Sequence, residues 1–251
     1  MTSSSKKYQN LEKVTIISIG FFLTFTGTGS SANLAAKAQQ DNGFDSLGLY
    51  QNATAYFIYI VSSFFGTAFV KKFGSKLTLF FGAACYLINI IEQILPALYA
   101  QQPENRDKQF YFRKGFIYSM GILAGVINGI GSGVIWTAQG EYVSNCANDE
   151  NKGFFFSYFY FIYMSSQIAG NIIAAIVLEN SQLTTYYIVM SIIMVVGCLL
   201  FLFLQKPIKS QTDILKSARC SGHFQYANFQ KNGLYAAFND FNRYQCNNIH
   251  W

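Results

Sequence analysis

The sequence predicts an all-α, polytopic membrane protein with six transmembrane helices and a polar C-terminal tail. Its 251 residues are 51% hydrophobic and 12% charged, and this charged fraction is about half that of soluble domains. The chain holds three prolines, and apolar runs of membrane-spanning length recur along it. Short polar connectors separate these runs, a pattern typical of a bundle of membrane helices.

Six apolar segments are each long enough to cross a bilayer, which takes about 20 residues. They are predicted at residues 14–36, 52–70, 77–98, 115–138, 153–178 and 184–204. The first segment lacks a small-residue cleavage site after a short apolar core, so we expect a retained helix rather than a signal peptide. The six-helix domain at 14–205 is expected to lie between a disordered N-terminus at 1–13 and a weakly structured tail at 206–251.

The distribution of lysine and arginine predicts the orientation of the chain. With the N-terminus inside, the inner segments hold nine of these residues and the outer loops hold five. Both termini are therefore expected in the cytoplasm. One inner connector is a basic loop with Lys71, Lys72, Gly74 and Lys76. Because the net charge of +6 is spread over such connectors, nucleic acid is not an expected partner.

Glycines set the spacing of the fourth segment. Gly121, Gly125 and Gly129 recur every four residues, and Gly133 continues the row. Such a row forms a flat stripe that lets a neighbouring helix approach closely. A phosphate-binding loop would need a preceding strand and a Gly-Lys-Ser/Thr ending, and neither is present. The stripe therefore predicts helix packing.

Polar side chains within the apolar segments are candidates for a cavity wall or a helix interface. These candidates are Asn33, Glu92, Asn128, Gln139, Gln167 and Asn171. Glu92, with Asn89 and Gln93 beside it, is either a functional carboxylate or a residue near enough the outer end to reach the interface. Gln167 and Asn171 share one helix face, where they either hold helices together or line a solute or ion path.

Hydroxyl groups and glycines interrupt the first segment between residues 24 and 31. Serine and threonine can bond to carbonyls of their own helix, so this run is either locally satisfied or a wall of a central cavity. The sequence shows no histidine in any apolar segment, no nucleophile elbow and no Cys-x-x-Cys pair among its five cysteines. We therefore expect no enzyme activity, no metal site and no cofactor.

Three strings carry a family resemblance: GIGSGVIWTAQGEY at residues 129–142, GFFF at residues 153–156 and SQIAGN at residues 166–171. Together with ANL at 32–34 and LGLY at 47–50, they resemble the uncoordinated-93 family, a branch of the major facilitator superfamily named for a potassium-channel regulator. The basic connector at 71–76 resembles the superfamily loop between helices two and three. It has Lys71 where an aspartate is expected, which argues against the usual gating ion pair.

The resemblance implies twelve helices in two six-helix halves, of which this chain would supply the N-terminal half. It also implies a non-catalytic protein that regulates ion channels or ion homeostasis, potassium homeostasis included. Two alternatives remain: half of a secondary transporter that dimerises around a solute path, and a truncated, inactive remnant. The expected partners are the lipid bilayer and an ion channel, another membrane protein or a second half-bundle.

Overall fold

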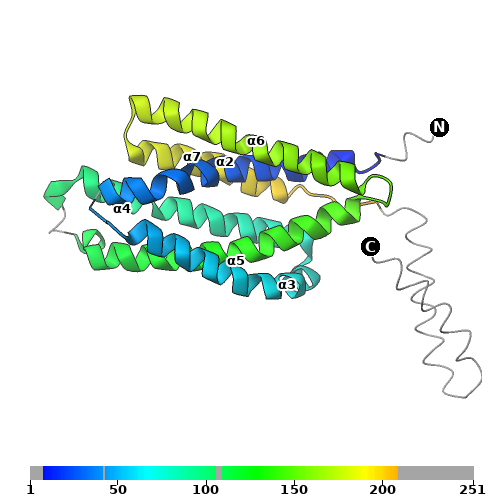
Figure 1. The fold of residues 1–251 in the computed structure, drawn as a ribbon, viewed down its shortest axis with the longest axis horizontal. Coiled ribbons are helices and arrows are strands. Elements are labelled where there is room, and N and C mark those ends of the chain that lie inside the picture. Colours follow the sequence, from blue (N-terminus) through cyan, green and yellow to red (C-terminus); the bar gives the residue numbers. More distant parts are fainter. Residues whose placement is uncertain (1–7, 42, 106–108, 209–251) are drawn as a thin grey trace, which may run out of the picture. The chain divides into compact units, whose positions relative to one another are not determined.

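The computed structural model describes residues 8–41, 43–105 and 109–208. For residues 33, 36 and 105 it describes the backbone and not the side chain. Within these residues every regular element is a helix (Figure 1). The elements are α2 (Leu11–Asp41), α3 (Leu47–Glu92), α4 (Ile94–Gln101), η1 (Pro103–Asn105), η2 (Phe110–Phe112), α5 (Lys114–Cys146), α6 (Lys152–Asn180) and α7 (Leu183–Phe201). The tail expected at 206–251 lies, from residue 209 on, outside the described residues.

Five helical stretches are long and apolar enough to cross a membrane, and one of them is long enough to cross it twice. The stretch Leu47–Gln101 comprises α3 and α4, and α3 bends sharply at Gly74, where φ is 79° and ψ is 156°. Its first arm (47–73) contains the segment predicted at 52–70, and its second arm (75–92) together with α4 contains the segment predicted at 77–98. The described residues therefore form six crossings, as the sequence predicts, and the all-α fold class is confirmed.

The helices run antiparallel in chain order, so their connectors gather at two ends of the helical bundle (Figure 1). The Gly74 end contains the start of α2, the bend of α3 and the α5–α6 connector. The Gln93 end contains the end of α2, the short helix α4 and the start of α5. These two names are used below for the two ends.

Helix α2 begins at Leu11, inside the region expected to be disordered. The side chain of Asn10 donates a hydrogen bond to the carbonyl oxygen of Cys146 at 2.9 Å, and Lys13 is buried. These contacts with the end of α5 hold the start of α2, which explains why the helix begins three residues before the predicted segment.

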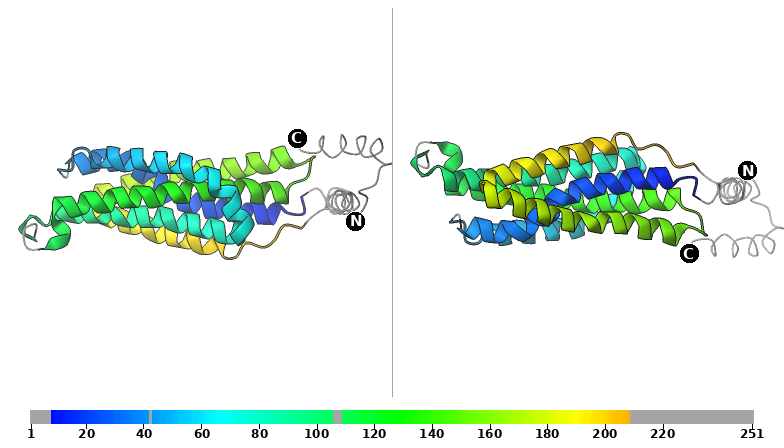
Figure 2. Two further views of the ribbon diagram at one scale, coloured as in Figure 1. Left: turned by 90° about the horizontal axis from the view of Figure 1, so that it is seen from below. Right: turned by 90° about the horizontal axis from the view of Figure 1, so that it is seen from above.

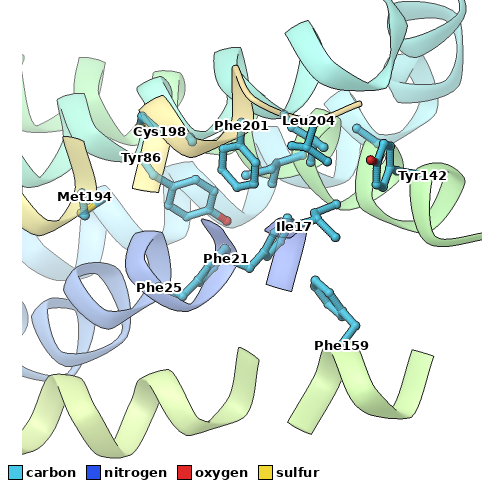
Figure 3. Close-up of a cluster of buried hydrophobic side chains, with 14 of the residues drawn as sticks. Ile17, Phe21, Phe25, Tyr86, Tyr142, Phe159, Met194, Cys198, Phe201 and Leu204 are labelled. Carbon is cyan, nitrogen blue, oxygen red and sulfur yellow. The ribbon is translucent and has the colours of Figure 1, made fainter. Parts of the chain in front are cut away.

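Large aromatic side chains fill the centre of the bundle (Figure 3). Phe21 of α2 is fully buried, and its ring centroid lies 5.0 Å from that of Phe159 and 5.7 Å from that of Phe201. Phe25, one turn later, lies 5.4 Å from Trp136 of α5. Edge-to-face contacts of this kind add to the stability of burial, so α2 joins α6 and α7 to α5.

Helix α5 lies between the two arms of α3 (Figure 2). A Cβ atom added at Gly125 would lie 2.7 Å from the carbonyl oxygen of Gln51, and one at Gly129 would lie 2.5 Å from that of Ala55. Gly121 and Gly133 likewise face Leu47 and Ser62 of the first arm. This close approach also permits a hydrogen bond of 2.9 Å from the Ser62 hydroxyl to the carbonyl oxygen of Gly129.

Candidate binding cavity

A cavity of about 230 Å³ lies between α2, both arms of α3 and α5. Its lining is polar or aromatic for the most part and contains no charged side chain. The lining residues are Phe25, Thr28, Ser31, Ala32, Ala35, Gln51, Asn52, Ala55, Tyr56, Tyr59, Tyr86, Asn89, Ile90, Gln93, Asn128, Ser132 and Trp136. A cavity lined this way suits a small uncharged molecule with hydrogen-bonding groups, or ordered water.

Five polar side chains meet at the Gln93 end of this cavity, and we call them the amide cluster: Gln39, Gln51, Asn89, Glu92 and Gln93. Gln51 is its centre. Its Nε2 donates to Asn89 Oδ1 at 3.0 Å and to Glu92 Oε2 at 3.1 Å. Its Oε1 accepts from Gln39 Nε2 at 3.2 Å and from Gln93 Nε2 at 2.9 Å. Gln39 Nε2 also donates to Gln93 Oε1 at 2.7 Å.

Two oxygens of the amide cluster are buried without a hydrogen-bond partner among the described residues. They are Glu92 Oε1 and Gln39 Oε1. Gln39, Gln51 and Gln93 are each at least 96% buried, so they lie away from bulk solvent. A buried polar atom without a partner is costly and calls for an explanation.

A hydroxyl pair links the aromatic wall of the cavity to its polar wall. Ser132 of α5 is 2.8 Å from the hydroxyl of Tyr86 and 2.8 Å from the carbonyl oxygen of Asn128. The Asn128 side chain itself lines the cavity, and its Oδ1 is buried without a partner among the described residues. This wall therefore offers both a carbonyl-type acceptor and an aromatic surface.

The hydroxyl groups of α2 bond to carbonyls of their own helix, and some of them also line the cavity. Thr26, Thr28 and Ser30 donate to carbonyls four residues earlier in their own helix, at 2.7, 3.0 and 3.0 Å. Thr28 and Ser31 also line the cavity. Ser31 lies 3.1 Å from the hydroxyl of Tyr186, so the run also joins α2 to α7.

The other candidates from the sequence occupy different places. Gln167 of α6 lies against Gly29 of α2, where an added Cβ would touch its amide group. Asn171, one turn further on, is exposed. Gln139 is buried outside the cavity lining, and its Nε2 has no partner among the described residues. Asn33 lies in α2, but its side chain is outside the description.

The basic connector forms the bend of α3 rather than a separate loop. Lys71, Lys72, Gly74 and Lys76 are all exposed. The ammonium group of Lys72 lies 5.4 Å from the ring centroid of Phe73. The connector thus lies at the opposite end of the bundle from the amide cluster.

Gln39 and Gln51 are functional candidates that the sequence did not reveal. Gln39 follows the first predicted segment, which ends at 36, and Gln51 precedes the second, which begins at 52. In the structure α2 continues to Asp41 and α3 begins at Leu47, so both glutamines point into the bundle from helix ends. Glutamines at the borders of two apolar segments are the signal that would have pointed to them.

Six apolar crossings around an internal polar cavity define a multi-pass integral membrane protein. The family model of the Major Facilitator Superfamily matches residues 17–240 of the sequence, and the chain belongs to this family. The proton:xylose symporter XylE, solved with 6-bromo-6-deoxy-D-glucose, superposes with a TM-score of 0.56 at 16% identity. That match covers 78% of this chain and 45% of the symporter chain, and shows a shared fold.

Within the superfamily, the chain is similar to unc-93-like proteins. It is 26% identical to protein unc-93 homolog A of Bos taurus over 67% of this chain and 34% of that protein. It is 24% identical to UNC93-like protein MFSD11 of Xenopus tropicalis, over 82% and 43% respectively. It is 25% identical to the putative potassium channel regulatory protein unc-93 of Caenorhabditis elegans, over 70% and 23%. The chain spans less than half the length of these relatives.

Proposed function

We propose that this chain acts without catalysis as a facilitator-type membrane protein that regulates an ion channel or ion homeostasis. The observation that carries the proposal is its similarity, over 70% of its length, to a putative potassium channel regulatory protein. We further propose that both ends of the six-helix domain face the cytoplasm, because basic residues favour that side nine to five.

The exposed face of α6 supports association with another membrane protein. Ile168 and Ile172 are 67% and 55% exposed, so this face is apolar. Asn171 is exposed on the same helix, and an amide facing lipid is unfavourable unless a neighbouring helix accepts its hydrogen bonds. A partner helix from a channel or a second half-bundle would satisfy it.

Electrophysiology tests the regulatory function. Potassium channels are expressed in cells with and without this chain, and whole-cell currents and surface channel levels are recorded. We expect the chain to shift the current of at least one channel and to co-purify with it, and we expect Asn171→Leu to weaken both effects. Unchanged currents across the channel panel, with the chain present at the membrane, would contradict the proposal.

The cavity favours a second candidate, half of a secondary transporter that dimerises around a solute path. Its uncharged amide, hydroxyl and aromatic lining fits a neutral polar solute. Vesicles containing the purified chain, loaded with labelled neutral solutes, should then show saturable flux that Asn128→Leu reduces. A dimeric chain with no flux would rule out this candidate.

A further inference from the structure

We propose that the amide cluster is a binding site for a monovalent alkali cation, with Glu92 as its charged ligand. The site deepens the proposed function, since it would make a protein of ion homeostasis responsive to the ion itself. It rests on the geometry of α2, α3 and the residue that joins α3 to α4, and not on any channel partner.

The charge of the cluster is the first argument. Glu92 Oε2 accepts a hydrogen bond from Gln51, a neutral amide, and no lysine or arginine among the described residues donates to either oxygen. A carboxylate within a membrane bundle is costly without a compensating charge. One carboxylate balances one monovalent cation, whereas a divalent ion would leave a buried positive charge.

The available oxygens are the second argument. Glu92 Oε1 and Gln39 Oε1 are buried and have no hydrogen-bond partner in the part of the chain that the structure describes, and both belong to one connected set of side chains. Carboxylate and amide oxygens are the ligands that hard cations prefer. The amide groups of Gln51, Asn89 and Gln93 can rotate to exchange nitrogen for oxygen and so supply further ligands.

Space and access are the third argument. A Cβ atom added at Gly121 would lie 3.4 Å from Glu92 Oε1, so the glycine places a position without a side chain next to this oxygen. Gln51, Asn89 and Gln93 also line the cavity. The cavity therefore gives a hydrated ion a route to the cluster, where amide oxygens can replace its water.

Equilibrium binding of radiolabelled sodium and rubidium to the purified full-length chain in detergent tests this site. We expect saturable binding, a higher unfolding temperature in sodium or potassium chloride than in choline chloride, and at least about tenfold weaker binding for Glu92→Gln. Glu92→Gln keeps an acceptor for Gln51, so its fold should persist. Glu179→Gln, which neutralises an exposed carboxylate at the end of α6, is the matched control and should bind as the wild type does.

Several outcomes would overturn the site. These are absent saturable binding, equal binding by Glu92→Gln and wild type, and tighter binding of calcium than of sodium or potassium. If the unfolding temperature changes with pH and not with these cations, Glu92 binds a proton rather than a cation. That result would also overturn the site. Cation binding without any effect on channel currents would remove the proposed function and leave the site intact, so the two failures are distinguishable.

Discussion

Gln51 makes most of the hydrogen bonds that hold the amide cluster together. It makes four of the hydrogen bonds in the cluster, two as donor and two as acceptor. We expect Gln51→Leu to leave several buried polar groups unpaired and to lower the free energy of unfolding by about 2–4 kcal/mol. Thermal unfolding in detergent measures this effect. Asn171→Leu, at an exposed position, should change stability by no more than about 0.5 kcal/mol, and equal effects of the two variants would contradict the network.

Gly121 lies next to the charged ligand of the proposed ion site and contributes no ligand itself. In Gly121→Ala the new methyl group would lie 2.9 Å from Leu47 Cδ1 and 3.4 Å from Glu92 Oε1. The leucine tip can move, so we expect a stability loss of at most about 1 kcal/mol. Sodium and rubidium binding should weaken about tenfold because the methyl group occupies the space beside the carboxylate oxygen. Unchanged binding, with a normal unfolding temperature, would show that the ion does not lie on this side of Glu92.

The sequence predicts part of the amide cluster. Glu92 stood out because a carboxylate in an apolar segment is rare, and its neighbours Asn89 and Gln93 were visible beside it. Gln39 and Gln51 were missed because hydropathy placed both just outside the apolar segments. The two glutamines meet because the ends of two helices pack together. The pattern of residues along one segment does not predict such a contact.

The α3–α5 contact depends on the absence of a side chain at the glycine stripe. A methyl group at Gly129 would meet the carbonyl oxygen of Ala55 at 2.5 Å and the Cβ of Ile58 at 2.7 Å, and neither atom can move without its backbone. We expect Gly129→Ala to destabilise the bundle by about 1–3 kcal/mol. Gly140→Ala lies in the same helix with nothing within 4 Å, and it should be neutral or stabilising by up to about 1 kcal/mol. The unfolding temperature of Gly129→Ala should therefore fall below that of the wild type, while that of Gly140→Ala should stay the same or rise.

The bend of α3 depends on backbone conformation rather than on space. Gly74 has φ 79° and ψ 156°, and a Cβ there would meet nothing within 4 Å. This region is accessible to glycine and strained for other residues, so Gly74→Ala should cost about 1–3 kcal/mol. Gly153→Ala, open and helical in α6, is the control and should cost nothing. Equal stability of the two variants would show that the bend tolerates a different backbone conformation.

Apolar run length predicted the number of crossings but not the bounds of the helices. The six predicted segments each fall largely within a described helix or helical arm. Helix α2 extends beyond its predicted segment at both ends, from Leu11 to Asp41, because polar residues at its ends find partners in the bundle, whereas α7 ends at Phe201, before the predicted end at 204. Hydropathy detects the part of a helix that lies in lipid, whereas tertiary hydrogen bonds decide where the helix stops.

At the scale of the whole molecule, the six crossings connect an aromatic centre to a polar end. Phe21 and Phe25 contact rings from α3, α5, α6 and α7, so α2 is the central helix of the apolar core. The amide cluster lies at the far end of the same helix, at Gln39. A ligand that reorders the cluster would therefore act on a helix that contacts every other crossing.

The orientation of the chain decides from which side an ion reaches the amide cluster. Residues 103–105 lie at the Gln93 end and residues 147–151 at the Gly74 end, on opposite sides of the proposed bilayer. Because basic residues favour the Gly74 end, we expect an epitope tag inserted at 103–105 to be detected from outside intact cells, or from the lumen of an intracellular compartment. A tag at 147–151 should lie on the cytoplasmic side of the membrane and be detected only after the membrane is permeabilised. The reverse result would place the Gln93 end, and with it the amide cluster, on the cytoplasmic side, so the cluster would respond to cytoplasmic rather than external sodium or potassium.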